Sequence, residues 1–189
     1  PAFELDVKYA GKTVADKLSD IREKMAAAEA DMHVVTTIDD ICWTLNIRGD
    51  DIDFFPLILS YALMDDKAYH LYIDERKLSD EIKAHLTADG VVLHPYNDIY
   101  EDIKHIPADA KLMLDASKVN YAMFCNIPDS VKKIDVMNPE MIFKNVKNPV
   151  ELENIRKAQI KDSIAHLRFM KWLKENVGKI EMTEISVSD

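Results

Sequence analysis

The sequence predicts an α/β fold, in which a mixed, mainly parallel sheet is flanked by helices and followed by a long C-terminal helix. Short apolar, β-branched segments alternate along the chain with segments of helical periodicity, which is typical of a sheet covered on both faces. Two strand-like segments are separated by only four residues, too few for a parallel crossover. Near the C-terminus, apolar residues recur at helical spacing over roughly 27 residues.

The first helix is predicted over residues 12–30. Its apolar residues recur three and four positions apart, and Thr13 is a suitable N-cap. These apolar residues are Val14, Leu18, Ile21 and Met25. The segment His33–Ile38 is apolar and β-branched and is bounded by acidic residues, so it is predicted to be a buried strand that leads into a short helical turn.

The next two predicted strands, Leu57–Met64 and Tyr69–Ile73, flank the turn Asp65–Lys67. So short a connection favours an antiparallel hairpin. Helices and strands then alternate. The expected elements are a helix over Leu78–Leu86 behind Ser79, a strand over Val91–His94, a helix over Asn97–Ile106 ended by Pro107, a strand over Lys111–Asp115, a helix over Val119–Asn126 and a strand over Lys132–Val136.

A strong helix start marks a domain boundary near residue 147. Asn148 can cap the helix, Pro149 fits its first position, and Glu151 can close a capping box. An apolar face follows until Gly178, which fits a C-cap. We therefore expect one domain over residues 1–146 and a second segment over 147–189.

Composition excludes several classes of function. The formal net charge of −10 argues against nucleic-acid binding, because neutralising phosphates requires clustered Lys and Arg. No apolar run approaches the roughly 20 residues of a membrane span. Cys42 and Cys125 are far apart in apolar surroundings, so both are expected to be buried reduced thiols of a cytoplasmic protein. Pro1 is not an initiator residue and the last residues resemble the start of a helix, so we expect a piece of a longer chain.

The most informative motif lies between Asp39 and Asp51, where Trp43, Leu45 and Ile47 alternate with polar residues. Together with three further segments, this motif resembles the middle domain of the Xaa-Pro aminopeptidases, in the creatinase/prolidase-like metallopeptidase family. The matching segments are D-D-I-x-W-x-x-N-x-R-G at residues 39–49, Phe54–Leu63 and Lys8–Leu18. A fourth segment begins with Lys147–Leu152 and ends with Trp172 and Leu173.

The resemblance implies a creatinase/prolidase N-terminal-like domain followed by the first helical segment of a truncated pita-bread metallopeptidase domain. The parent enzyme would hydrolyse the N-terminal residue that precedes proline, using two divalent ions, expected to be manganese. In the family the ligands of these ions (two Asp, one His and two Glu) belong to the C-terminal domain. The implied partners are the remainder of the catalytic domain, a peptide substrate and a second copy of the protein.

The residues themselves supply no catalytic, cofactor-binding or metal-binding motif. The six histidines are scattered without HExxH spacing, no GxSxG occurs, and four glycines are too few for a phosphate loop. Adjacent acids such as Asp39 and Asp40 rarely converge on one site in an extended chain, because neighbouring side chains point to opposite faces. The isolated chain is therefore expected to be inactive.

Arg48 and Asn46 are the candidate contacts with a substrate cleft. A guanidinium offers a fixed fork of donors, and Gly49 would allow another backbone to approach closely. A structural role is favoured for both: Arg48 could pair with Asp50, Asp51 or Asp53, and Asn46 could bond its own turn. Trp43 is expected to be buried against residues 32–38.

Two other classes of function remain open. The chain could be a stand-alone binding or interaction module with the same fold and no attached peptidase. A small self-contained α/β hydrolase is the weakest alternative, because no nucleophile elbow is present. A downstream reading frame with the metal-ligand set would separate the leading interpretation from the binding module.

Overall fold

The computed structural model describes residues 1–188, so Asp189, the last residue of the predicted second segment, lies outside the described residues. The chain separates into two compact units, one formed by Pro1–Lys147 and one that begins at Asn148. The strands of the first unit are β1 (Phe3–Glu4), β2 (Met32–Val35), β3 (Ile47–Arg48), β4 (Ser60–Met64), β5 (Tyr69–Ile73), β6 (Val91–Pro95), β7 (Lys111–Leu114) and β8 (Lys132–Asp135).

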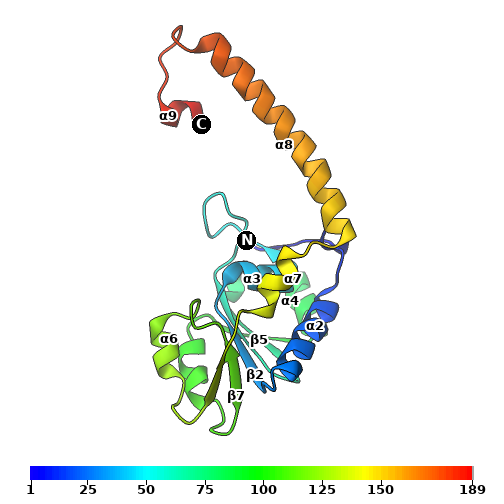
Figure 1. Cartoon of the computed structure of the whole chain (residues 1–189), viewed down its shortest axis with the longest axis vertical. Coiled ribbons are helices and arrows are strands. Elements are labelled where there is room, and N and C mark those ends of the chain that lie inside the picture. Colours follow the sequence, from blue (N-terminus) through cyan, green and yellow to red (C-terminus); the bar gives the residue numbers. More distant parts are fainter. Residues whose placement is uncertain (189) are drawn as a thin grey trace. The chain divides into compact units, whose positions relative to one another are not determined.

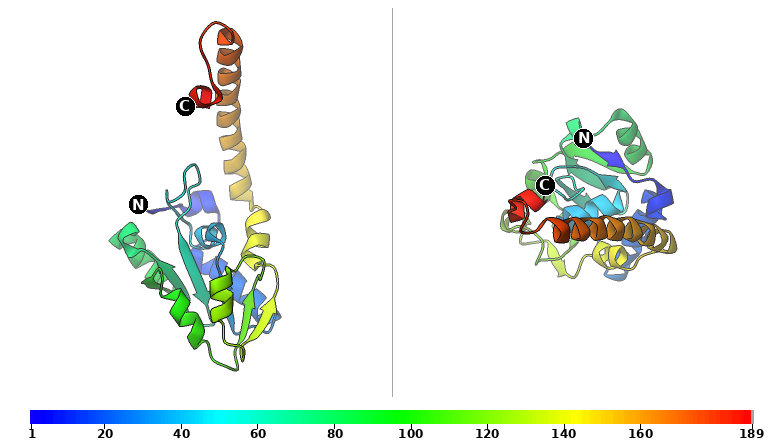
Figure 2. Two further views of the ribbon diagram at one scale, coloured as in Figure 1. Left: turned by 90° about the vertical axis from the view of Figure 1, so that its left-hand side faces the viewer. Right: turned by 90° about the horizontal axis from the view of Figure 1, so that it is seen from above.

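Helices connect most of these strands (Figure 1). The helices of the first unit are α1 (Val7–Ala10), α2 (Val14–Ala27), α3 (Ile38–Thr44), α4 (Asp80–Ala88), α5 (Ile99–Asp102), α6 (Tyr121–Asn126) and α7 (Pro139–Asn145), with short 3-10 turns η1 (Glu75–Lys77) and η2 (Ile103–His105). The second unit contains α8 (Pro149–Asn176) and α9 (Glu184–Ser188). Figure 2 shows α8 as one uninterrupted helix.

Within the described residues, six strands form one sheet in the order β6-β5-β4-β2-β7-β8. The pairs β5–β6, β2–β7 and β7–β8 are parallel, whereas β4 runs antiparallel to both of its neighbours. The mixed, mainly parallel sheet is therefore confirmed, and the predicted hairpin is the β4–β5 pair. The small ribbon of β1 and β3 lies outside this sheet.

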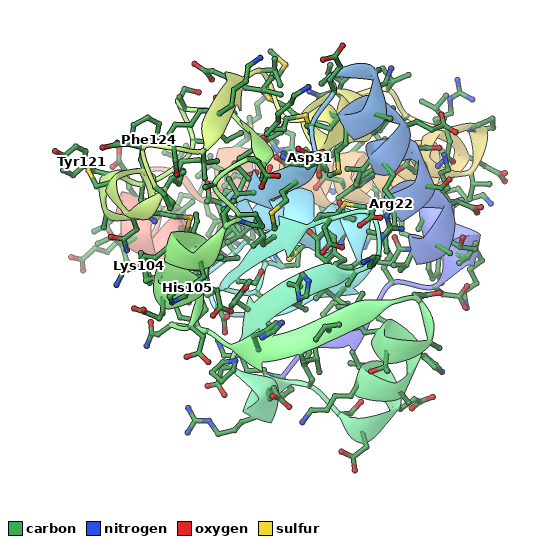
Figure 3. The ribbon with its side chains drawn as sticks, turned by 90° about the horizontal axis from the view of Figure 1, so that it is seen from below. Arg22, Asp31, Lys104, His105, Tyr121 and Phe124 are labelled. Carbon is green, nitrogen blue, oxygen red and sulfur yellow. The ribbon has the colours of Figure 1, made fainter. Side chains whose placement is uncertain are left out.

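Each face of the sheet is covered by a separate apolar cluster. Residues of α2, α3 and α4 pack on one face, around Ile21, Ile41 and Leu71. Residues of α5, η2 and α6 pack on the other, around Ile103 and Met123. Seen from below, Arg22 of α2 and Tyr121 of α6 lie on opposite sides of the sheet (Figure 3). This layering is the one expected for strands that alternate with helices.

The predicted caps are present in the structure. The side chains of Thr13 and Ser79 accept hydrogen bonds from the N-terminal turns of α2 and α4. Asn148 and Glu151 form a reciprocal capping box at the start of α8. Each cap satisfies backbone donors that a helix leaves without a partner.

Several predicted boundaries were wrong. The strand predicted over His33–Ile38 ends at Val35, because Thr37 bonds the carboxylate of Asp40 and α3 begins at Ile38. The strand predicted from Leu57 begins only at Ser60. The single helix predicted over Asn97–Ile106 is divided into α5 and η2. Helix α7 was not predicted, although Asn138 followed by Pro139 is a start signal.

Candidate functional site

The polar segment after α3 begins with a left-handed turn. Asn46 has a φ of 51°, a conformation that asparagine adopts more readily than most other residues. Its backbone oxygen accepts a hydrogen bond from the N–H of Leu5 at 2.7 Å. The turn therefore joins the end of α3 to the N-terminal segment and directs the chain into β3.

Both polar atoms of the Asn46 side chain have partners within the protein. Oδ1 accepts a hydrogen bond from Nζ of Lys17 at 2.6 Å, and Nδ2 donates to the carbonyl of Lys12 at 2.9 Å. Asn46 lines a small pocket of about 280 Å³ beside Thr13 and His85, but only 6% of the residue is exposed. The expected bond to its own backbone turn is replaced by one bond to Lys17 of α2 and one to Lys12, which lies two residues before that helix.

Lys17 is a buried cation that sequence analysis missed. Only 1% of the residue is exposed, and its Nζ donates to the carbonyl of Trp43 at 2.6 Å as well as to Asn46. The same ammonium lies 4.1 Å from the centroid of the Trp43 ring. One signal was available, because Lys17 lies on the apolar face of its helix, three residues after Val14 and four before Ile21.

Trp43 is 9% exposed, so the predicted burial is confirmed. The aromatic partner of its ring is Phe143 of α7, at 6.5 Å between centroids. Together with the Lys17 ammonium, this places α2 and α7 around the ring. The prediction had named only the strand segment 32–38 as its packing surface.

Arg48 uses its guanidinium to join backbone segments. Nη1 donates to the carbonyls of Cys42 at 2.7 Å and Ile47 at 2.8 Å. Of the acids expected to pair with Arg48, Asp50 contacts the N-terminal amine of Pro1, and Asp51 binds Lys77 at 2.6 Å. The observed bonds of Arg48 fix the last turn of α3 against β3.

Gly49 is required by a close approach of two chain segments. A Cβ at this position would lie 3.0 Å from Cβ of Ile58 and 3.3 Å from the carbonyl of Leu57. The carboxylate of Asp51 accepts the N–H of Leu59 at 2.7 Å. The base of the loop between residues 49 and 59 is therefore tightly constrained.

The tip of this loop exposes aromatic side chains. Phe54 is fully exposed with a φ of 67°, and Phe55 is 62% exposed. An isolated bridge joins Ile52 to Phe55. The loop is drawn in cyan and extends from the body of its unit (Figure 1). From the sequence, Phe54 was identified only as the start of a segment that resembles the family, and its exposure was not predicted.

The described residues do not converge into a metal centre: among them, no group of three or more His, Cys, Asp or Glu side chains has a suitable arrangement. His70 and His94 do approach, with Nδ1 of one 2.9 Å from Nε2 of the other. Burial of His94 and its proximity to His70 lower the pKa of His94. A dinuclear metal site does not fit this donor set.

Both cysteines are free thiols in the structure. Cys42 is buried, and burial raises the pKa of its thiol. Cys125, in contrast, is exposed near the end of α6, so the prediction of two buried cysteines was wrong for Cys125. Its apolar neighbours in the sequence belong to a short helix that buries Met123 but turns Cys125 outward.

These features define a three-layer α/β domain whose Asn-x-Arg-Gly segment is bonded mainly to its own framework. The sequence profile of the creatinase/prolidase N-terminal domain matches residues 1–151. The chain belongs to the creatinase/prolidase N-terminal domain family. Among residues 1–188, no helix combines the length and apolar character that crossing a membrane requires.

Three relatives cover nearly all of the chain. A protein of Sordaria macrospora named "Probable Xaa-Pro aminopeptidase P" is 33% identical over 200 residues, which span 100% of this chain and 33% of that protein. "Xaa-Pro aminopeptidase 1" of Dictyostelium discoideum is 33% identical over 99% of this chain and 30% of its own length. The chain thus spans about a third of these curated relatives.

The third relative is a solved structure. An X-prolyl aminopeptidase from Caenorhabditis elegans superposes with a TM-score of 0.91 and 31% identity, over 99% of this chain and 31% of that one. It is described as "a cytosolic enzyme with a di-nuclear active site".

Proposed function

We propose that this chain is the middle, non-catalytic domain of a cytoplasmic Xaa-Pro aminopeptidase, joined to the first helical segment of its catalytic domain. The observation that carries the proposal is the similarity to the C. elegans X-prolyl aminopeptidase over 99% of this chain but only 31% of the enzyme. We place the domain over residues 1–146 and the helical segment over 147–189. The separation of the two units after Lys147 supports this division.

The parent enzyme would hydrolyse the bond between an N-terminal residue and a following proline. Two divalent ions, which we expect to be manganese, would activate water and polarise the scissile carbonyl. The described residues of this chain do not fit such a centre, so its ligands would belong to the remainder of the catalytic domain. This chain would position that domain and restrict access to the cleft.

Within this role, we propose that Asn46 and Arg48 support the base of the loop between residues 49 and 59, whose tip carries Phe54. Their bonds to Lys17, Lys12 and Cys42 hold the loop in place. Contact of Arg48 with a peptide substrate is the finer alternative, supported by the partial exposure of Arg48 on β3.

Sequencing the gene beyond the codon for Asp189 tests the proposal directly. A continuation that carries two Asp, one His and two Glu in the order of the family's ligand set would support it. A reading frame that closes without this set would instead favour a stand-alone binding module, because a shared fold does not fix a function.

We expect the purified 189-residue chain to bind no catalytic metal and to cleave no Xaa-Pro peptide. The reason is that the carboxylates and imidazoles of residues 1–188 form no group suited to a metal ion. Calorimetry with manganese and a peptide-hydrolysis assay would measure both properties, with a complete Xaa-Pro aminopeptidase as positive control. Stoichiometric manganese binding together with hydrolysis would contradict the proposal.

The apolar face of α8 predicts how the isolated chain behaves. Ile155, Ile164 and Leu167 are each about half exposed or more, and no residue of α8 is buried. Burying about 400 Å² of apolar surface stabilises by roughly 10 kcal/mol as an upper limit. We propose that the remainder of the catalytic domain covers this face in the parent and that a second copy covers it in the isolated chain.

Light scattering coupled to size-exclusion chromatography would measure this association. We expect a dimer at micromolar concentration, and a shift toward monomer when Ile164→Gln and Leu167→Gln are combined. Lys161→Gln, a change at an exposed polar position of the same helix, is the control and should leave the dimer intact. A monomer at high micromolar concentration would exclude self-association through α8.

A further inference from the structure

A buried histidine–glutamate pair joins the central strand of the sheet to α7. His33 lies on β2, between β4 and β7, and Glu140 lies in the first turn of α7. Both side chains are 0% exposed. Nε2 of His33 is 3.2 Å from Oε2 of Glu140, and Nδ1 of His33 is 3.1 Å from the carbonyl oxygen of Met113.

Between a carbonyl and a carboxylate, one protonation state of the His33 ring satisfies both partners. Both ring nitrogens of His33 face acceptors, a carbonyl that can only accept and a carboxylate. Only the imidazolium carries two N–H donors. A neutral ring that donates from Nδ1 to Met113 would direct the lone pair of Nε2 at the carboxylate of Glu140. Loss of one proton therefore removes the bond between β2 and α7 and leaves a buried carboxylate without its cation.

The other titratable groups around the pair come from α3, β5 and α7. Asp40 of α3 is 2% exposed, and its carboxylate binds Lys144 of α7 at 2.8 Å. Tyr69 of β5 and Cys42 of α3 also face this region, and burial, followed by the charges of Glu140, Asp40 and Cys42, raises the pKa of Tyr69 well above its usual value.

Burial has the largest single effect on His33 and lowers its pKa. The charge and hydrogen bond of Glu140, the carbonyl of Met113 and the charge of Asp40 outweigh that effect, so the pKa is raised above its usual value of 6.5. This direction agrees with the geometry, in which the protonated ring is the one that satisfies both acceptors.

The polar surroundings of Glu140 are incompletely paired. Within the described residues, four buried atoms have no hydrogen-bond partner: Oγ1 of Thr44, the Tyr69 hydroxyl, Oδ1 of Asn138 and Oε1 of Glu140. Each unpaired buried atom carries an uncompensated desolvation cost. The carboxylate of Glu140 is thus bonded through Oε2 to His33, while Lys144 holds the other end of α7 to Asp39 and Asp40.

We propose that His33 and Glu140 form a proton-dependent latch, which holds α7 on the sheet while the imidazole is protonated and weakens as that proton is lost. Helix α7 ends at Asn145, and the cap of α8 is Asn148. The latch therefore acts on the helix that precedes the second unit in the chain. This proposal does not depend on the peptidase assignment.

The sign of the pH dependence follows from the raised pKa. The stabilisation of the closed α7 by the latch is complete below the pKa of His33 in the unfolded chain, about 6.5. This stabilisation is lost as pH rises through the higher pKa of His33 in the folded chain. One proton changes the opening equilibrium by at most about tenfold per pH unit. Opening of α7 should thus become easier between neutral and mildly alkaline pH.

Amide hydrogen exchange of the 189-residue chain, detected by mass spectrometry, tests the latch. The exchange is measured between about pH 5.5 and 8.5, in steps of about one pH unit. Protection factors of peptides covering residues 138–147 should decrease as pH rises, by up to about tenfold for each pH unit. In Glu140→Gln the amide can pair with either form of His33, so this dependence should disappear. His33→Gln, which carries a donor at every pH, should also abolish it.

His85→Gln is the matched control, because His85 forms an exposed ion pair with Glu4. That variant should keep the wild-type dependence of α7. Protection that stays constant in the wild type, or that keeps its pH dependence in both latch variants, would overturn the proposal. If the variants do not fold, an NMR titration of the His33 ring in the wild type tests the latch instead. A ring that is already neutral at about pH 5.5, or one that is still charged at about pH 8.5, would exclude a latch in this pH range.

Discussion

Replacing Trp43 by alanine is expected to lower the free energy of unfolding by about 3–5 kcal/mol. The indole is 9% exposed, stacks on Phe143 and lies under the ammonium of Lys17. Its removal would leave a cavity between α2, α3 and α7 that these partners cannot easily fill. Urea unfolding followed by circular dichroism would measure the loss without relying on tryptophan fluorescence, since the chain contains only two tryptophans.

Phe54→Ala is the matched control for Trp43→Ala. Phe54 belongs to the same unit and also carries an aromatic ring, but it is fully exposed. Its truncation should change stability by less than about 0.5 kcal/mol, as surface substitutions usually do. A loss below about 1 kcal/mol for Trp43→Ala would show that the ring contributes little to packing.

Elements with a local signal were predicted well from the sequence. Thr13, Ser79 and the pair Asn148 and Glu151 all cap the helices that their positions indicated. The β4–β5 hairpin followed from a connection too short for a crossover. In each case the interactions that decide the structure lie within a few residues of one another.

Where two local signals competed, the prediction failed. The apolar residues before Ile38 favoured a continued strand, but Thr37 and the acids Asp39 and Asp40 form a helix start. Acidic side chains stabilise the first turn of a helix by about 0.3–1 kcal/mol. The helical signal therefore ended the strand at Val35.

Polar pairs between distant segments could not be predicted. Glu140 lies 107 residues after His33, and Asn46 lies 29 residues after Lys17. The sequence identified Asn46 and Arg48 as notable, but their role depends on partners that only the folded chain brings together. The burial of Lys17 was missed for a different reason. A lysine on an otherwise apolar helix face usually extends its charged end to solvent.

The bonds around Lys17 hold the start of the Asn-x-Arg-Gly segment to two helices. One buried ammonium joins α2, the end of α3 and the left-handed turn at Asn46. Arg48 then ties the following strand back to Cys42. The loop that carries Phe54 therefore begins from a fixed position, whether its final role is to contact a substrate or another domain.

Replacing Lys17 by methionine is expected to lower the free energy of unfolding by about 2–4 kcal/mol. Each of the two buried acceptors that lose their donor costs roughly 1–3 kcal/mol, and partial relaxation of the surrounding structure reduces the sum. Methionine keeps most of the aliphatic volume but cannot donate to the carbonyl of Trp43 or to Oδ1 of Asn46. The attraction between the ammonium and the Trp43 ring is lost as well. Removing a buried cation also removes its desolvation cost, which acts in the opposite direction. We expect the lost bonds to dominate, because both acceptors remain buried.

Lys24→Met is the control, since Lys24 lies on the same helix and is exposed. It should change the free energy of unfolding by less than about 0.5 kcal/mol. In Lys17→Met, amide exchange should also accelerate over residues 44–49, because the Asn46 turn loses its anchor. If Lys17→Met were as stable as the wild type and the turn kept its protection, the cation would not be holding this segment.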